Sequence, residues 1–226
     1  MKNSLIKISI TVGLTVSSQA ASIAVGDQVG LDFGPTTTNN WNNITSNNAG
    51  IPAGEVINLG GVVMDGMSII TSNSQFANND GTNNWSGLST EGGAAPAEFV
   101  DSVTTDITGN FNLGDGSPYT VILSGLSIGL RYDVTAVTTA SFTRIDTVSI
   151  NGGTPSSISR PDSVAGAFHS FSGVSANGSG ELVITVVDTA ATENPVINGL
   201  LVTAVPESSS LALLSFASLA FLVRRR

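Results

Sequence analysis

The strongest constraint on the fold is the short period of the apolar residues between positions 21 and 204. Apolar and polar side chains alternate over short runs, and no helical apolar period lasts three turns. Alternation of this kind indicates strands, because successive strand residues point to opposite faces of a sheet. The predicted strands are 29–33, 62–64, 67–70, 119–123, 132–137, 143–150, 167–171, 182–187 and 196–202.

Turn-forming residues separate these runs. Asp65-Gly66 predicts a hairpin between 62–64 and 67–70, and Asn151-Gly152 and Asn177-Gly178 predict turns in the second half. Strands spaced about ten residues apart favour an all-β fold, a β-sandwich of the jelly-roll type, with a closed barrel as the alternative. One short helix is expected at 95–103. Since the chain has no cysteine, packing alone must stabilise the domain.

The first 20 residues have the pattern of an N-terminal signal peptide. A basic start, an apolar run over 8–16 and the small residues Ser18 and Ala20 are what signal peptidase requires. We therefore expect cleavage after Ala20 and an exported domain at 21–204.

The last 22 residues, 205–226, also read as a signal. Val205-Pro206-Glu207 precedes an apolar run over 211–223, and Arg224, Arg225 and Arg226 end the chain. A helix over this run would be about 20 Å long, which makes a short transmembrane helix, and the arginines favour the cytoplasmic side. This order of parts resembles the PEP-CTERM sorting tail, although Ser208 replaces the second proline. The resemblance implies processing by an exosortase-type enzyme, and simple membrane anchoring is the alternative.

Charge excludes several ligand classes. Between 21 and 205 the chain carries 16 acidic residues and only Arg131, Arg144 and Arg160, a net charge of about −13. Binding to nucleic acid or to an anionic lipid surface draws its affinity from basic side chains. Neutral ligands and cations remain.

The exported region also resembles the galactose-binding-like jelly-roll domains that precede PEP-CTERM tails. The similarity lies in the segments Leu31-Asp32-Phe33-Gly34-Pro35, Leu123-Ser124-Gly125-Leu126, Tyr132-Asp133-Val134, Gly180-Glu181-Leu182-Val183-Ile184 and Ile197-Asn198-Gly199-Leu200. These are strand and turn features, so the resemblance implies a fold and names no ligand.

Sugar binding is the best-supported chemistry. An aromatic face can stack on a pyranose ring while neighbouring amides bond its hydroxyls. The two tryptophans have that environment: Trp41 lies beside Asn40 and Asn42, and Trp85 follows Asn84. The alternative is that each tryptophan pins a long loop to the sandwich.

Metal binding and catalysis have weaker signals. The segment 78–84 is rich in oxygen ligands around Asp80, which suits calcium, but it lacks the EF-hand pattern. The jelly-roll resemblance implies a structural calcium ion without naming its ligands, and no other cofactor is expected. A Ser-His-acid site would have to use His169, whose alternation with Phe168 predicts a solvent-facing side chain.

These observations predict an exported, non-enzymatic β-sandwich of the cell surface or extracellular matrix. Extracellular polysaccharide is its expected ligand, and signal peptidase and an exosortase-type enzyme are its expected processing partners. The inner membrane would hold an anchored intermediate. Two alternatives stay open: an exported hydrolase of polysaccharides or esters, and a structural matrix protein without a ligand.

Overall fold

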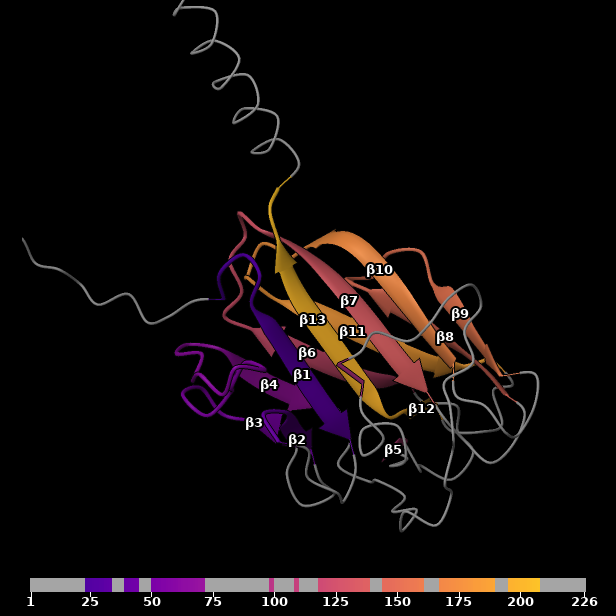
Figure 1. The fold of residues 1–226 in the computed structure, drawn as a ribbon. Coiled ribbons are helices and arrows are strands. Elements are labelled where there is room, and N and C mark those ends of the chain that lie inside the picture. The colour runs from indigo at the N-terminus through magenta and orange to yellow at the C-terminus, as the bar shows by residue number, and fades with distance from the viewer. Residues whose placement is uncertain are drawn as a thin grey trace, which may run out of the picture.

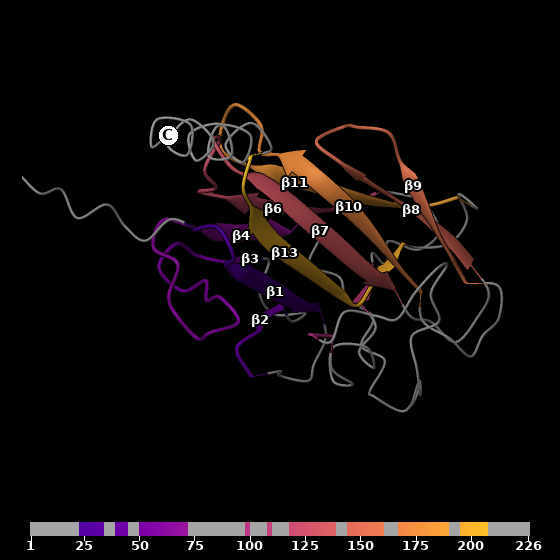
Figure 2. The ribbon, with the colours of Figure 1, turned by 45° about the horizontal axis from the view of Figure 1, so that its top comes forward.

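The computed structural model describes residues 23–33, 39–44, 50–71, 98–99, 108–109, 118–138, 144–160, 167–189 and 195–207. They form an all-β sandwich of two packed sheets (Figure 1; Figure 2). The predicted sandwich is confirmed. The signal peptide at 1–20 and the apolar run at 211–223 lie outside the described residues, within which no helix is long and apolar enough to cross a membrane.

Five strands form the first sheet, which we call sheet A. Their order is β10 (Ala167–Ser175), β7 (Arg131–Thr138), β13 (Gly199–Val205), β1 (Gln28–Phe33) and β2 (Asn42–Ile44). All neighbours are antiparallel except β1 and β2, which are parallel.

Six antiparallel strands form sheet B, in the order β3 (Gly50–Ile51), β4 (Ser68–Thr71), β6 (Tyr119–Ser124), β11 (Leu182–Asp188), β8 (Arg144–Ile150) and β9 (Ser156–Arg160). A two-stranded ladder joins β12 (Val196–Ile197) to β5 (Thr108–Gly109). From β6 onward the chain crosses repeatedly between sheets A and B, as it does in a jelly roll.

The main core lies between the sheets. Alternate residues of the long strands fill it, so that β6 buries Tyr119, Val121 and Leu123 while β11 buries Leu182, Ile184 and Val186. The rings of Phe33 and Tyr119 meet edge to face across the two sheets, with centroids 6.0 Å apart. The alternation that predicts the strands therefore also identifies this core.

One predicted pairing is wrong. Asp65-Gly66 does form a turn, in which the Met67 amide donates to the Met64 carbonyl. However, residues 62–64 pair with 56–58: the Met64 amide donates to Val56 at 2.7 Å, and the Asn58 amide donates to Val62 at 2.9 Å. This arrangement buries both Val56 and Met64, and it leaves β4 free to pair with β3 and β6.

The expected helix at 95–103 falls mostly outside the described residues. Glu98 lies in a turn and Phe99 in irregular structure. Both residues lie against sheet A, because Gln28 donates a hydrogen bond to Glu98 at 3.3 Å and Phe99 packs on Trp41.

Candidate ligand-binding end of the sandwich

The two ends of the sandwich differ in their connections. At one end, which we call the turn end, β6 joins β7 through residues 125–130, β8 joins β9 through 151–155, and β10 joins β11 through 176–181. At the opposite end, the loop end, lie the last residues of β1, β4, β7, β9 and β11 and the first residues of β6, β8, β10 and β13. β1 ends at Phe33 and β4 ends at Thr71, both at the loop end, and the chain continues from these two residues toward Trp41 and Trp85.

Polar residues are buried beneath the loop end. Asp32 and Asp146 are 0% exposed, Asp188 is 3% exposed and Asn198 is 0% exposed. Each lies within two residues of a strand terminus at this end, and none is without a partner. Because a buried charge is costly unless it is paired, such residues tie structure together at a fixed position.

Two of these carboxylates face each other. The β8–β11 register places Asp146 directly opposite Asp188, on the same side of sheet B as Val148 and Val186. On the other side of β8, the register pairs Arg144 with Arg160 on β9, two residues along the strands. Two of the three arginines between 21 and 205 thus lie near this acidic pair, one on β8, which carries Asp146, and one on the neighbouring strand β9.

A tyrosine is also buried beneath the loop end. Tyr119 is fully buried, and Thr71 on the neighbouring strand is hydrogen-bonded to its hydroxyl. Burial raises the pKa of Tyr119 far above its usual value of 10.0, an effect that the hydrogen bond only partly offsets. The phenol therefore stays neutral and acts as a packing group at neutral pH.

Trp41 is a packing residue in this structure. It lies on the outer face of sheet A, directly over Gly30, where a methyl group on that glycine would come within 2.6 Å of the indole. Its ring meets Phe99 at a centroid distance of 5.4 Å, and the two form a second buried cluster with Val137 and Leu201. With 7% of its surface exposed, Trp41 pins its segment to the sheet and offers no open face to a sugar.

The neighbouring asparagines also have structural roles. Asn42 donates to the carbonyls of Gly30 at 2.9 Å and Ile57 at 2.7 Å, and its side-chain oxygen accepts from the Ile57 amide. Asn40 is exposed and adopts a left-handed backbone with φ of 61°. Asn42 is thus engaged with the backbone, while Asn40 remains open to solvent. Trp85, Asn84 and Asp80 lie outside the described residues, so their binding roles remain predictions.

The prediction for His169 is wrong in its face. Alternation does put it opposite Phe168, but Phe168 packs on the outer cluster of Trp41 and Phe99. His169 shares the inner face of β10 with Phe171, and their rings lie 4.7 Å apart in an edge-to-face arrangement. Both faces of sheet A carry apolar clusters, so an inward aromatic cannot be told from an outward one by alternation alone.

Sequence reasoning missed the buried aspartates. Turn positions explain Asp65, but Asp146 and Asp188 continue the inward alternation of Val148 and Val186 to the strand ends. Their spacing of two residues from these inward valines is the sequence feature that could have identified them as buried. Among the described residues no group of three His, Cys, Asp or Glu side chains could hold a metal ion.

Comparison with known proteins identifies resemblances to solved carbohydrate-binding structures. No protein-family model and no curated protein matches the chain. A CBM35 from Cellvibrio japonicus Abf62 matches 60% of this chain and 92% of its own, at 19% identity and a TM-score of 0.33. A Xyl-CBM35 in complex with a glucuronic acid-containing disaccharide matches 62% and 99%, at 20% identity and a TM-score of 0.32.

A third resemblance is to an enzyme. The exo-beta-1,3-galactanase of Phanerochaete chrysosporium matches 43% of this chain but 23% of its own, at 24% identity and a TM-score of 0.31. Likenesses at this level leave the ligand and activity of this chain open.

Proposed function

We propose that the protein is an exported, non-enzymatic carbohydrate-binding β-sandwich of the cell surface or extracellular matrix, with its ligand at the loop end. The observation that carries this proposal is the asymmetry of the two ends. Three short turns and the longer segment 52–67 connect the strands at one end, whereas β1 and β4, after which the chain continues toward Trp41 and Trp85, both terminate at the other. Binding residues are commonly found on loops that a rigid scaffold positions.

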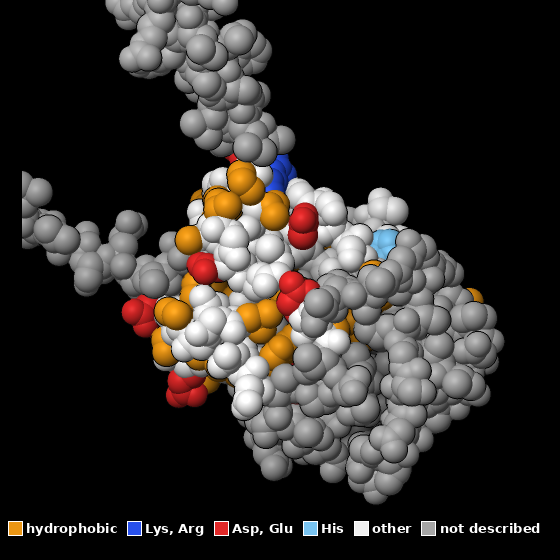
Figure 3. Space-filling model, in the orientation of Figure 1, with side chains coloured by type: hydrophobic (Ala, Val, Ile, Leu, Met, Phe, Trp, Pro, Cys, Tyr) orange, Lys and Arg blue, Asp and Glu red, His pale blue; other side chains and the backbone are white. Residues whose placement is uncertain are grey.

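The charge of the domain supports a neutral ligand. A net charge of about −13 between 21 and 205 repels sulfated and uronic glycans unless a cation bridges them. Acidic side chains are spread over the described part of the face seen in Figure 3, and a single basic patch is visible there, near the end of the described chain. Asparagine-rich segments supply the amides that neutral sugar hydroxyls require.

Two observations favour binding over hydrolysis. Asp146 and Asp188 are adjacent, as the carboxylates of a glycosidase must be, but they are buried among valines instead of facing a substrate. The His169 ring lies against Phe171, with no serine nucleophile motif in the chain. Both features suit a stable scaffold.

Export and sorting complete the proposal. Cleavage after Ala20 retains Ile23, which is 1% exposed and belongs to the main core. The PEP-CTERM-like tail, from Val205 through Arg226, would then direct the domain to an exosortase-type enzyme at the inner membrane. Replacing Arg224, Arg225 and Arg226 with serine should increase the released or misprocessed fraction in cell fractionation, and unchanged localisation would contradict the sorting role.

A glycan array with the purified protein, with and without calcium, tests the ligand class. Trp85→Ala should weaken a hit by about 1–3 kcal/mol if Trp85 is a binding hot spot, without lowering the melting temperature. Val25→Ala is the matched control, because Val25 is 53% exposed and lies next to the turn end. If no glycan binds, the structural-matrix alternative replaces this proposal.

A further inference from the structure

The Val-Pro-Glu motif begins inside the folded domain. Val205 is the last residue of β13, which lies between β7 and β1 in sheet A. The register pairs Val205 with Arg131 on β7. On the β1 side, Ala204 accepts a hydrogen bond from the Gly26 amide at 2.8 Å and donates one to Asp27 at 3.0 Å. The chain is therefore held on both sides up to the residue before the motif.

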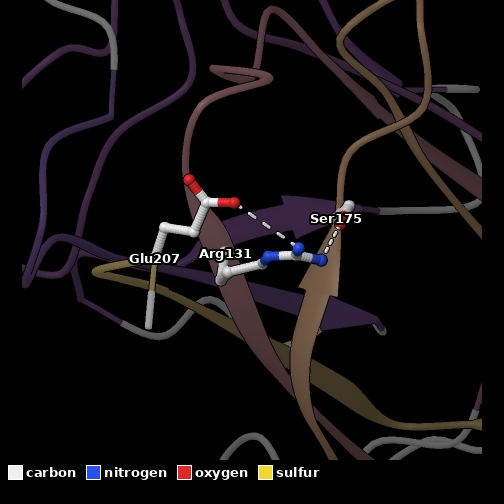
Figure 4. A network of polar contacts seen from close by, with 3 residues as sticks. All are labelled: Arg131, Ser175 and Glu207. Carbon is white, nitrogen blue, oxygen red and sulfur yellow. Dashed lines mark hydrogen bonds and ion pairs between the residues drawn. The ribbon is translucent and has the colours of Figure 1, made fainter. Parts of the chain in front are cut away.

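The motif's carboxylate is also held. Nη2 of Arg131 lies 3.6 Å from Oε1 of Glu207, so the residue that pairs with Val205 through the backbone also forms an ion pair with Glu207 (Figure 4). Nη1 of the same guanidinium donates to the hydroxyl of Ser175 on β10. Glu207 is thus connected to two further strands of sheet A.

We propose that this docked arrangement is an autoinhibitory contact, which withholds Val205, Pro206 and Glu207 from the processing enzyme until the end of β13 opens. The proposal rests on the sorting function proposed above. An enzyme that binds a substrate segment in extended form needs its main-chain groups and its recognition side chain free. Here the Val205 backbone faces Arg131 in the β7 register, and the Glu207 carboxylate faces the Arg131 guanidinium.

The contact adjusts a rate and does not block processing. The side chains of Arg131 and Glu207 are 39% and 42% exposed, and ion pairs this exposed are weak. Terminal segments of a strand also open locally at far lower cost than the whole domain. Removing the guanidinium should therefore speed access to the motif about two- to fivefold.

The first test measures access to Glu207 directly. The full chain, kept in detergent, is treated with a glutamate-specific endoprotease, and cleavage after Glu207 is followed by mass spectrometry. We expect Arg131→Gln to be cut about two- to fivefold faster than wild type, and Arg131→Lys, which keeps the charge, to remain close to wild type. Equal rates for Arg131→Gln and wild type would overturn the proposal.

Tyr132→Phe provides the matched control for general loosening of the sheet. Tyr132 adjoins Arg131 on β7, and its hydroxyl donates to the Ser127 carbonyl at 2.9 Å instead of to Glu207. If Tyr132→Phe accelerates cleavage as much as Arg131→Gln does, the faster cleavage comes from general destabilisation of the sheet, and the contact is not autoinhibitory.

The second test follows processing in cells by pulse-chase. Arg131→Gln should shorten the processing half-time by the same factor. If wild type is processed but Arg131→Gln is no faster, the gate fails and the sorting proposal stands. If wild type is never processed although Glu207 is protected from the endoprotease, the sorting proposal fails. The contact then has no processing enzyme from which to withhold the motif, and the autoinhibitory role fails with it.

Discussion

The turn end and the loop end of this sandwich solve the same structural problem in different ways. At the turn end the connections bond to one another: the Leu126 amide donates to Gly180, and the Asn151 side chain donates to Ser175 and accepts from the Val183 amide. At the loop end, the buried polar groups Asp32, Asp146, Asp188 and Asn198 lie at the strand termini themselves. One end is thus fixed by its turns and the other by residues of the strands.

This difference shows how a sandwich can carry variable segments without losing its register. A connection that supplies its own hydrogen bonds needs a particular sequence, such as Asn151-Gly152, where both residues have positive φ. An end whose strand termini are anchored by buried polar side chains places fewer demands on the segments that follow. Binding residues can then vary there while the scaffold is retained.

The largest expected effect comes from removing a core tyrosine at each end. Tyr119 and Tyr132 are both 0% exposed and lie on successive strands, the first at the loop end and the second at the turn end. Each change to alanine should lower the free energy of unfolding by about 3–5 kcal/mol, measured in urea. Only Tyr119→Ala should also weaken glycan binding by the folded fraction. Equal losses of binding at both ends would contradict the assignment of the ligand to the loop end.

The next effect tests the role of Trp41. Gly30→Ala would place a methyl group 2.6 Å from the indole and force the ring away from sheet A. Overpacking of this kind should cost about 1–3 kcal/mol of unfolding free energy. Gly178→Ala at the turn end is the matched control, since nothing lies within 4 Å of its added methyl group, and its effect should stay within about 0.5 kcal/mol. A neutral Gly30→Ala would show that Trp41 is free to move.

Alkaline pH should distinguish the two tyrosines, which are the only ones in the chain. Burial raises the pKa of both in the folded state above the usual tyrosine value of 10.0. Their neutral forms therefore stabilise the fold fully below pH 10, and this stability is lost above it, as the unfolded chain gains by ionising. At pH 11, one unit above the pKa in the unfolded chain, a tyrosine that stays protonated in the fold lowers the free energy of unfolding by about 1.4 kcal/mol.

The fall in unfolding free energy at high pH should shrink more in Tyr119→Phe than in Tyr132→Phe, because Tyr119 has the larger rise in pKa. Urea denaturation at pH 8 and pH 11 measures the difference. An alkaline loss that survives in both variants would assign it to other groups.

Most of the scaffold could be predicted from the sequence, whereas the candidate site could not. The strands β6, β8 and β11 alternate cleanly and bury one face, so their periodicity identifies them. β9 was missed because Ser156–Arg160 contains one isoleucine, Ile158, and otherwise only polar residues. β2 and β3 were missed because three and two residues are too short to show a period.

Side-chain faces were harder to predict than strands. The face of His169 was assigned wrongly because sheet A is covered on both sides, by the main core and by the cluster around Trp41 and Phe99. Likewise, an aspartate that follows an inward alternation looks like the polar end of a strand until its burial is known. Both errors arise from tertiary contacts of residues far apart in the sequence.

The smallest expected effect concerns the turn end, where Asn151 can be changed without touching the loop end. Asn151→Ala removes its bonds to Ser175 and Val183 and puts a residue with a poor left-handed preference at φ of 51°. Because the residue is exposed, water replaces part of what is lost, and the unfolding free energy should fall by about 1 kcal/mol. Asn151→Gly should recover the backbone part of this loss and not the hydrogen bonds. Neither variant should change glycan affinity, since the turn lies at the end of the sandwich opposite to Phe33 and Thr71, the strand ends from which the chain continues toward the two tryptophans. A loss of affinity in Asn151→Gly, measured by titration of an array hit at a temperature where both proteins are folded, would show that the ligand contacts the turn end or that the two ends are coupled through β8 and β11.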